Sequence, residues 1–389
     1  MHKILLISAA LAGVSFAQFT QAVTPEQALA RLFTQGPIKP EWFAPEVLKQ
    51  VPLAQIQAVI TGIAQQGGAF QKAVPAGQDF TLEFEKTLVT ATLRLDAQGK
   101  ITTLLFKAVK PRVKDLREAM KGYFTLPGKF SVVVMKNGQV LQQAGVTEPL
   151  AVGSTFKLAV LAALQEQIEA KKLGWDTVVT LEPQDISLPS GQLQDWYPGA
   201  HFTLETLAGL MVSQSDNTAT DALIRILGRE AIEKFLPAAN QPLLTTRNLF
   251  ALRDAANKSA LELYLKGDVA AKREVLKQLD QIPAQKIQFS GTQGDLRAEW
   301  LLTPTEACTL MSKVQNLKIT QINPGVVNPA DWKQVSYKGG SEVGVLNLTT
   351  ALLDQAGNTY CVSATWNHTQ AIDDSNFIQL YMNVLGSLE

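Results

Sequence analysis

The sequence predicts an α+β protein of two domains behind a cleavable N-terminal segment. The first observation is size, because 389 residues with 46% hydrophobic side chains exceed what one ordinary core organises. The second is a change of period between residues 24 and 110, where helical spacing of apolar residues gives way to strict alternation. The third is that strand patterns stand at both ends of the remaining chain, with helical patterns between them. This arrangement favours one antiparallel sheet, built from both ends of the second domain, beside a helical body.

Residues 1–17 have the pattern of a secretory signal peptide. Lys3 gives a positive start, residues 4–14 form an apolar run, and Ser15 and Ala17 place small side chains where a signal peptidase reads them. The alternative, a short membrane anchor, is disfavoured because a bilayer core needs about 20 residues. Cleavage after Ala17 is expected to give an exported protein, periplasmic or secreted. No cysteine lies nearby for a lipid anchor, and no later apolar segment is long enough to span a membrane.

Composition excludes several classes of function. Lysine plus arginine and aspartate plus glutamate both number 35, so no net charge attracts nucleic acid or an anionic membrane. The 2 cysteines and 3 histidines cannot build a disulfide scaffold or a thiolate zinc cluster, and neither a metal nor another cofactor is expected. Cys308 and Cys361 could pair in an oxidising compartment, but two separate buried thiols are the favoured prediction. The oligomeric state is left open.

Residues 18–110 are predicted to form a small α+β domain. Apolar side chains recur with helical spacing over residues 28–33 and 56–63. Alternating side chains then predict strands over residues 80–85, 89–95 and 101–106. Helices followed by antiparallel strands indicate helices packed on one face of a sheet. We interpret this domain, which has no cluster of catalytic residue types, as a binding or positioning module, with a boundary in the basic stretch 107–114.

Residues 111–389 are predicted to form the second domain. Asn137-Gly138 stands between two apolar runs and indicates a hairpin, because both residues of the tight turn need positive φ. Helical patterns dominate residues 155–314, and a last helix is expected over residues 373–385. The other predicted elements are a helix over residues 113–123 and strands over residues 131–135, 139–141, 334–337, 343–353 and 359–366.

The usual base of a serine hydrolase is scarce in this sequence. No G-x-S-x-G, H-E-x-x-H or Walker motif is present. After cleavage of the signal peptide only His201 and His368 remain, and each is interpreted as a surface or hydrogen-bonded histidine rather than a base. A serine hydroxyl needs a base to become a good nucleophile, so the scarcity of histidine leaves that task to lysine.

Ser154 and Lys157 form an S-x-x-K motif at the predicted start of a helix. Three residues of helical spacing place both side chains on one face. A lysine acts as a base only when neutral, and burial beside a second cation lowers its pKa. The helix N-terminus and the Ser154 amide would stabilise a developing oxyanion. Taken alone, the motif equally suits a capping serine with a surface lysine.

Two further motifs strengthen this interpretation. The S-D-N tripeptide at residues 215–217 follows one apolar helix and precedes another, so a tight connection directs short polar groups to one place. A capping turn is its alternative interpretation. The K-G-G tripeptide at residues 338–340 precedes a predicted strand, where glycines let a substrate backbone approach the strand edge. Its alternative is a plain β-turn.

In order and spacing the three motifs resemble the signature set S-x-x-K, S-D-N and K-T-G of class A β-lactamases and penicillin-binding proteins. The resemblance covers roughly residues 113–389 and implies a β-lactamase/transpeptidase-like fold with an acyl-enzyme mechanism. By element order alone, the N-terminal domain resembles the cystatin-like or steroid-isomerase-like domains found ahead of this fold in some exported actinobacterial relatives.

The resemblance implies a role for each motif residue. Ser154 would be the acylated nucleophile and Lys157 its base or proton relay. Ser215 would pass a proton to the leaving group, and Lys338 would supply positive charge to Ser215 and to a substrate carboxylate. The implied substrate-binding residues are Asn217, which would hydrogen-bond a substrate amide, Gly340, and Ser341, whose amide would complete the oxyanion hole with that of Ser154.

The sequence departs from the family pattern at two places. Gly339 stands where the family has threonine, which removes a charge-assisted hydrogen bond of about 1.5–3 kcal/mol to a substrate carboxylate. Weaker recognition of carboxylates is therefore expected. The glutamate that activates the deacylating water is missing near residues 245–250, although Arg247 could match the arginine that anchors its loop. Asp254 and Glu262, the next acids, are expected on an exposed helix face, and residues 254–286 are a predicted insertion.

Together these observations predict an exported serine hydrolase that forms an acyl-enzyme on Ser154. The expected substrates are small-molecule amides, lactams or esters, with β-lactam hydrolysis or acylation and slow deacylation. An esterase or a D-Ala-D-Ala peptidase of the same fold is an alternative. The alternative from another class is a non-catalytic binding protein that kept the fold, and the presence of all five polar motif side chains argues against it.

Overall fold

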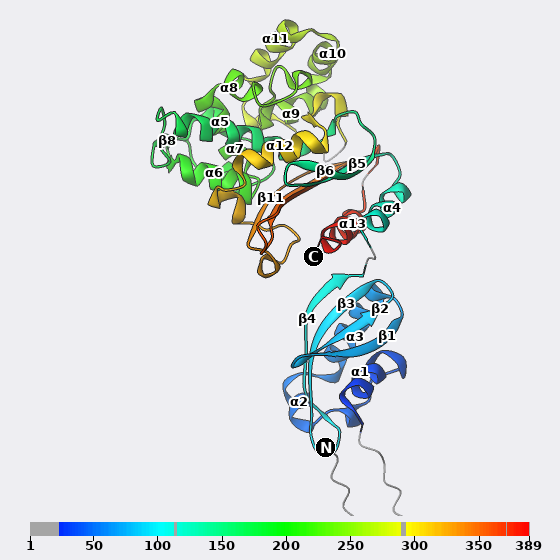
Figure 1. Cartoon of the computed structure of the whole chain (residues 1–389). Coiled ribbons are helices and arrows are strands. Elements are labelled where there is room, and N and C mark those ends of the chain that lie inside the picture. The colour runs from blue at the N-terminus through cyan, green and yellow to red at the C-terminus, as the bar shows by residue number, and fades with distance from the viewer. Residues whose placement is uncertain (1–22, 113–114, 289–292, 371, 389) are drawn as a thin grey trace, which may run out of the picture. The chain divides into compact units, whose positions relative to one another are not determined.

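The computed structural model describes residues 23–112, 115–288, 293–370 and 372–388 (Figure 1). The predicted signal peptide, with its cleavage site after Ala17, lies outside these residues. The chain divides into two units, the first ending at Arg112 and the second beginning at Val113, beside the boundary predicted after residue 110.

The first unit packs its helices against one face of a four-stranded antiparallel sheet with the order β1-β2-β3-β4. Strands β2 and β3 bury every second side chain, as their alternation predicts, and Leu82, Phe84 and Val89 meet Leu29 and Ile60 of the helices. Its elements are α1 (Pro25–Thr34), α2 (Pro45–Gln50), α3 (Leu53–Gly67), β1 (Phe70–Ala76), β2 (Asp79–Phe84), β3 (Thr87–Leu95) and β4 (Ile101–Pro111).

Three details of this unit differ from the prediction. Val59 fits the helical spacing of α3 but is 47% exposed. Strand β1 is not predicted because, at the sheet edge, it shows no regular alternation and buries no side chain fully. Strand β4 continues to Pro111, beyond the boundary predicted from the basic stretch, because it pairs with β3 along its length. As β4 is also an edge strand, the missing amide of Pro111 is tolerated.

The second unit contains the five-stranded antiparallel sheet predicted from both ends of the domain, in the order β11-β12-β13-β5-β6. The hairpin between β5 and β6 turns at Asn137 and Gly138, whose φ angles of 49° and 79° are both positive as expected. The strands are β5 (Lys129–Lys136), β6 (Gln139–Gly145), β11 (Gln334–Glu342), β12 (Val345–Leu353) and β13 (Thr359–Asn367), with short pairs β7 (Leu150–Ala151), β8 (Val178–Thr180), β9 (His201–Thr203) and β10 (Leu301–Leu302).

Helices cover both faces of this sheet (Figure 1). On one face, Phe377 and Tyr381 of α13 and Met120 of α4 share a core with Val132 and Val362 of the strands. On the other face α12 packs against β12, β13 and β5 and joins the sheet to the helical body. The helices are α4 (Leu116–Lys121), α5 (Lys157–Glu169), α6 (Leu204–Ser213), α7 (Asn217–Leu227), α8 (Arg229–Glu233), α9 (Thr246–Arg253), α10 (Lys258–Lys266), α11 (Val269–Leu279), α12 (Pro304–Val314) and α13 (Asp374–Gly386).

Helix α5 is the centre of the helical body. Every side chain from Lys157 to Leu164 is buried, so this helix is enclosed on all sides rather than along one stripe. Its first turn therefore carries a lysine directly into the core. The short 3₁₀ helices are η1 (Pro40–Trp42), η2 (Gly122–Thr125), η3 (Gly153–Phe156), η4 (Pro183–Asp185), η5 (Leu193–Asp195), η6 (Ala238–Asn240), η7 (Ala255–Asn257), η8 (Ala284–Lys286), η9 (Leu296–Ala298), η10 (Lys318–Gln321) and η11 (Pro329–Asp331).

The K-G-G motif lies inside a strand, where the sequence predicts that it precedes one. Strand β11 continues from Tyr337 to Glu342, because Gly339 pairs with Leu348 and Gly340 with Asn347 of β12. Glycines carry no side chain that could show alternation, so the strand predicted from alternation ends at residue 337, before the observed end of β11. Because β11 is the first strand of the sheet, the motif lies on an open edge.

Cys308 and Cys361 form a disulfide, so the prediction of two separate thiols is wrong. The bond joins α12 to β13 across the sheet–helix interface, with 5.8 Å between the Cα atoms and a sequence separation of 53 residues. Nothing local in the sequence reports that distance. Within the described part of the chain, no helix is long and apolar enough to cross a bilayer.

Candidate active site

The three sequence motifs meet at one hollow of about 420 Å³ on the open edge of the five-stranded sheet. Five of the predicted site residues line it, namely Ser154, Ser215, Lys338, Gly340 and Ser341. The other two, Lys157 and Asn217, are buried behind Ser215 and contact each other. All seven residues named from the sequence are therefore brought together.

Ser154 is held in the 3₁₀ helix η3, which runs directly into α5. The two residues that follow it are fixed in the core: the Thr155 hydroxyl donates to Asn347 Oδ1 at 2.7 Å, and the Phe156 ring stacks on Trp300 with 3.8 Å between centroids. Ser154 itself is only partly buried. The chain thus presents one hydroxyl to the hollow from a rigid support, and the first amides of the helix lack partners within it.

The S-D-N turn between α6 and α7 is fixed by its middle residue. Asp216 accepts from the amide of Ala219 at 2.8 Å, as the cap of α7, and from the amides of Gln192 and Leu193 at 2.8 and 2.9 Å. Ser215 has a φ of 57°, a left-handed conformation that a residue with a side chain rarely adopts. Because the buried Asp216 carboxylate holds the turn, it maintains this conformation and directs Ser215 at the two lysines.

Lys157 is fully buried and its ammonium nitrogen has three partners. It lies 2.6 Å from the Ser215 carbonyl oxygen, 3.2 Å from Ser215 Oγ and 2.7 Å from Asn217 Oδ1. Among the described residues it forms no hydrogen bond with Ser154 Oγ, one helical turn away. Lys157 is thus positioned against the S-D-N turn.

Asn217 supports Lys157 rather than facing the hollow. Its side-chain oxygen accepts from Lys157, and its side-chain nitrogen donates to the Leu188 carbonyl at 2.7 Å. Only 4% of the residue is exposed. The asparagine thereby fixes the lysine and the loop that carries Leu188, whereas the substrate contact implied by the family resemblance stays a prediction.

Ser215 Oγ lies between two buried lysines. Lys338 Nζ is 3.1 Å from it on the strand side and Lys157 Nζ is 3.2 Å from it on the helix side. Lys338 Nζ also donates to the Gly339 carbonyl. A hydroxyl has two lone pairs and one proton, so two donated hydrogen bonds leave the Ser215 proton for a group in the hollow.

Burial depresses the pKa of both lysines. The pKa of Lys157 falls well below its usual value, first because the side chain is desolvated and second because the Lys338 cation lies close, while the carboxylates of Asp221, Asp216 and Glu342 oppose this shift. Desolvation lowers the pKa of Lys338 to about 7. Neutral amine is thus available near neutral pH, which is the condition under which a lysine accepts a proton.

Glycines bring strand β11 against η3. A Cβ on Gly340 would lie 2.0 Å from the Val152 carbonyl oxygen and 2.6 Å from the Ser154 amide nitrogen, so any side chain would force the two segments apart. A Cβ on Gly153, whose φ is +50°, would lie 3.1 Å from the Ser341 amide nitrogen. This close approach puts the amides of Ser154 and Ser341 on one side of the hollow, where two donors can face one developing negative charge.

The acids near the site are already paired. Glu342 is the one carboxylate among the described residues that line the hollow, and it forms an ion pair with Arg253 at 2.8 Å. Asp221 accepts from the amides of Thr246 and Arg247 at 2.7 and 2.9 Å, at the start of α9. Asp254 was expected on an exposed helix face, but it is buried and accepts from the Gln288 amide at 2.8 Å. Its position after the end of α9 explains the difference, because it caps the next turn.

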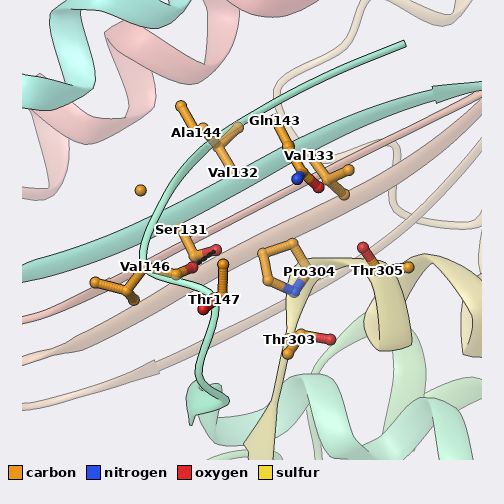
Figure 2. A pocket seen from close by; sticks show the side chains of 11 residues that line it. Ser131, Val132, Val133, Gln143, Ala144, Val146, Thr147, Thr303, Pro304 and Thr305 are labelled. Carbon is orange, nitrogen blue, oxygen red and sulfur yellow. Dashed lines mark hydrogen bonds between the residues drawn. The ribbon is translucent and has the colours of Figure 1, made fainter. Parts of the chain in front are cut away.

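The histidines and a second hollow lie apart from the motifs. His201 in β9 is exposed and His368 is half-buried after β13, and neither lines the motif-bearing hollow. A hollow of about 260 Å³ lies between the paired strands β5 and β6 on one side and the start of α12 on the other. Figure 2 shows its lining side chains, which include Ser131, Thr147 and Thr303. None of its described lining residues is titratable. The described residues also contain no cluster of three metal-ligating side chains.

Sequence reasoning missed several residues of the hollow. Tyr337 and Glu342 flank the K-G-G motif in β11, and Ser190 donates to the Ser215 carbonyl at 2.9 Å from a loop far away in the sequence. The position of Tyr337 and Glu342 beside a recognised motif was the available signal. No sequence signal pointed to Ser190, because only the tertiary fold brings its loop to the S-D-N turn.

Comparison with known proteins places this geometry in a family. A model of the β-lactamase enzyme family matches residues 111–322, more than half of the 389-residue chain. The chain therefore belongs to the β-lactamase enzyme family. The predicted fold class, a β-lactamase/transpeptidase-like α+β domain with an antiparallel sheet and a helical body, is confirmed.

Individual relatives are distant. Beta-lactamase VEB-1 of Pseudomonas aeruginosa is 29% identical over 89 residues, which cover 22% of this chain and only 29% of VEB-1. A β-lactamase structure from Sphaerobacter thermophilus DSM 20745 has 17% identity and a TM-score of 0.49, covering 70% of this chain and 95% of that one. The structure of PBP-A has 17% identity and a TM-score of 0.47, covering 70% and 94%.

Proposed function

We propose that this protein is an exported serine hydrolase that forms an acyl-enzyme on Ser154 with a small-molecule lactam, amide or ester, β-lactams included. One observation carries the proposal: Ser215 Oγ lies 3.1 and 3.2 Å from two buried lysines at the edge of the hollow that Ser154 lines. Burying two amines beside one hydroxyl is costly for stability, and proton transfer explains why the fold retains them.

In the proposed acylation, the proton lost by Ser154 is replaced on the leaving atom by way of Lys157 and Ser215. Ser154 Oγ attacks the substrate carbonyl, and neutral Lys157 takes its proton. The tetrahedral oxyanion is stabilised by the amides of Ser154 and Ser341. As the C–N or C–O bond breaks, the Ser215 hydroxyl gives its proton to the leaving atom and regains one from protonated Lys157, which returns to its neutral form. The acyl group remains on Ser154 as an ester.

Deacylation is expected to be slow because, among the described residues that line the hollow, no carboxylate is free to activate water. Among the described residues that line the hollow, the one acid is Glu342, which is already paired with Arg253. Thr246, near the family's missing glutamate, is fully buried, and its hydroxyl is hydrogen-bonded to the Asp221 carboxylate and the Ser187 hydroxyl instead. Hydrolysis of the acyl-enzyme then depends on the lysines or on unassisted water.

Export is supported by two independent features. The sequence of residues 1–17 has the charge, apolar core and small cleavage-site residues of a signal peptide. The Cys308–Cys361 disulfide is of a kind that persists in oxidising compartments such as the periplasm or the extracellular space. For the N-terminal unit, whose sequence carries no catalytic cluster, we retain the role of a binding or positioning module.

Peptides are a second candidate class of substrate, favoured by the strand edge. The K-G-G motif lies on the open side of β11, which offers backbone donors and acceptors to an extended chain. A peptidase acting on D-Ala-D-Ala ends would use that edge, whereas an esterase would not need it. A panel of nitrocefin, p-nitrophenyl esters and D-Ala-D-Ala peptides separates these activities.

Intact-mass spectrometry tests the proposed acyl-enzyme. After incubation with benzylpenicillin or p-nitrophenyl acetate, the wild-type protein is expected to gain the mass of one acyl group and to keep it for many minutes. Ser154→Ala is expected to gain no mass, because its nucleophilic oxygen is gone. Ser312→Ala, at an exposed serine of α12, serves as the matched control and should be acylated like the wild type. The proposal is wrong if wild type and Ser154→Ala both show neither adduct nor hydrolysis.

The rate of acylation is expected to depend on pH through Lys338. Its pKa of about 7 makes it cationic below that pH and neutral above it. A cation binds a substrate carboxylate more tightly than a neutral amine does. The second-order acylation rate constant of benzylpenicillin, divided by that of its methyl ester, should therefore fall as pH rises through about 7, by roughly tenfold or more.

The methyl ester is the internal control for this measurement. Deprotonation of Lys157 affects the acylation of both compounds alike, so their ratio isolates the charge of Lys338. A ratio that stays constant between about pH 5.5 and pH 8.5 would show that Lys338 does not bind the carboxylate as a cation.

A further inference from the structure

Tyr337 occupies the space that a side chain at position 339 would need. Two residues apart on β11, Tyr337 and Gly339 face the same side of the strand. A Cβ built on Gly339 would lie 2.2 Å from the Tyr337 hydroxyl oxygen and 3.0 Å from its ring carbon Cζ. The phenol tip thus covers Gly339, and the absence of a side chain there is a requirement of this packing.

A second glycine holds the tyrosine ring in this position. Gly325 has a φ of +63°, and a Cβ on it would lie 2.7 Å from Cδ2 of the Tyr337 ring. The loop before η11 therefore packs its backbone directly on the ring. Between Gly325 on one side and Gly339 beneath its tip, Tyr337 is confined, and its hydroxyl is held at the strand edge.

Tyr337 packs against the core of the sheet and also lines the hollow that carries the motifs. Tyr337 lines the same hollow as Ser154, Ser215 and Lys338. Its hydroxyl has no hydrogen-bond partner among the residues that the structure describes, although burial raises its pKa to about 12 and keeps it a neutral donor. The Lys338 ammonium donates to the Gly339 carbonyl, so a phenol O–H and a cation flank the same residue.

We propose that the Tyr337 hydroxyl binds the substrate's carboxylate beside Lys338, in place of the hydroxyl that Gly339 lacks. The sequence alone indicates a weakened carboxylate site at this motif. The structure supplies a donor of the same chemistry from the neighbouring position on the same strand face. This assignment rests on the proposed function, since it concerns the substrate of the same hollow, and it makes Tyr337 a specificity-determining residue.

Tyr337→Phe tests the assignment because it removes the hydroxyl and keeps the ring between the two glycines. With benzylpenicillin and its methyl ester as probes, we expect the second-order acylation rate constant of the acid to fall about 10- to 100-fold, as for loss of a hydrogen bond to a charged group. The constant of the ester should change less than about threefold. Tyr197→Phe, at a tyrosine that is 69% exposed, is the matched control and should change neither constant.

A binding measurement keeps this test separate from the acylation proposal. In the Ser154→Ala background, which cannot be acylated, the dissociation constant of benzylpenicillin is measured by calorimetry with and without Tyr337→Phe. A tenfold or greater weakening supports the assignment even if the wild type forms no acyl-enzyme. Equal constants, or an equal loss for acid and ester, overturn it while leaving acylation of Ser154 intact.

A double substitution at positions 337 and 339 tests the assignment by recovery of function rather than by its loss. Gly339→Thr alone should lower acylation of benzylpenicillin, because the new side chain collides with the phenol tip. Tyr337→Ala alone should lower it by removing the hydroxyl. Tyr337→Ala combined with Gly339→Thr should recover most of the preference for the acid over the ester. A double variant with no better preference than Tyr337→Ala would count against the shared position of the two hydroxyls.

Discussion

Replacing Lys157 with methionine is expected to slow acylation of Ser154 by about 10²- to 10⁴-fold, the contribution typical of general acid–base catalysis. Lys157 is fully buried, and its Nζ is 2.6 to 3.2 Å from its three partners in the S-D-N turn. Desolvation and the Lys338 cation lower its pKa, which makes the neutral base available. Methionine is unbranched and similar in volume, although one atom shorter, and it has no group that accepts a proton.

The stability of the Lys157→Met variant should change far less than its activity. Removing a buried amine relieves a desolvation cost, while Asn217 and Ser215 lose a donor, and the two effects oppose each other. The matched control is Lys172→Met, at an exposed lysine just after α5. Stopped-flow or intact-mass kinetics give the rate, and thermal unfolding gives the stability. If the acylation rate constant of Lys157→Met is within tenfold of the wild-type value, Lys157 is not the base.

The pH profile separates a base from a merely structural lysine. With the neutral methyl ester as substrate, wild-type acylation should increase with pH well below the ordinary lysine pKa of about 10.4, because deprotonation produces the active form. Lys157→Met should lose that dependence together with the rate. A wild-type profile that rises only near pH 10 would show an ordinary lysine.

Arg253→Met is expected to lower the free energy of unfolding by about 3–5 kcal/mol, the cost of leaving a buried ion-pair partner alone. Arg253 is 8% exposed and pairs with two carboxylates, Glu299, which is fully buried, and Glu342, which lines the hollow. The arginine thereby ties the end of α9 to the strand that carries Ser341. Its loss should also weaken acylation by loosening that strand.

The loss of unfolding free energy in Arg253→Met should be larger at high pH than at low pH. Burial raises the pKa of Glu299 to about 7, above its usual value, while the Arg253 cation opposes this rise. A carboxyl with a raised folded-state pKa stabilises the fold below its unfolded pKa, and that contribution is lost as pH rises through about 7. Without Arg253 the ionised carboxylate is uncompensated, so the variant should be most destabilised at about pH 8 and less at about pH 5.5.

Chemical denaturation at both pH values measures this effect. Arg297→Met is the matched control, since its side chain is 74% exposed in a pair with Asp295 and such surface pairs contribute little to stability. A loss below about 1 kcal/mol for Arg253→Met, or one that is equal at the two pH values, would show that the carboxylates are not buried as charges.

The local parts of the site were predictable from the sequence. Three-residue spacing on a helix brings Ser154 and Lys157 to one turn, and a short connection between two apolar helices holds S-D-N. The Asn137-Gly138 hairpin and the strands at both domain ends follow from turn chemistry and alternation. These features depend on neighbours a few residues apart, which is the range that sequence patterns report.

Contacts between distant segments were not predictable. The Cys308–Cys361 bond, the burial of Asp254 and the approach of Ser190 to Ser215 each depend on where separate elements come to lie. The sequence pattern places the K-G-G motif before a strand because glycines show no alternation, whereas pairing with β12 makes it part of an edge strand.

By itself, the sequence predicted the fold class, which is confirmed, and it indicated the lysine-based serine chemistry proposed above, since the scarcity of histidine and three short motifs point to that chemistry. Only the tertiary structure showed the role of Gly339. On the sequence it is a lost hydroxyl, but in the fold its missing Cβ makes room for the Tyr337 phenol, which Gly325 holds from the other side. The physical reason is packing. The role of a glycine depends on which group occupies the space where its side chain would be, and only the tertiary structure shows that group.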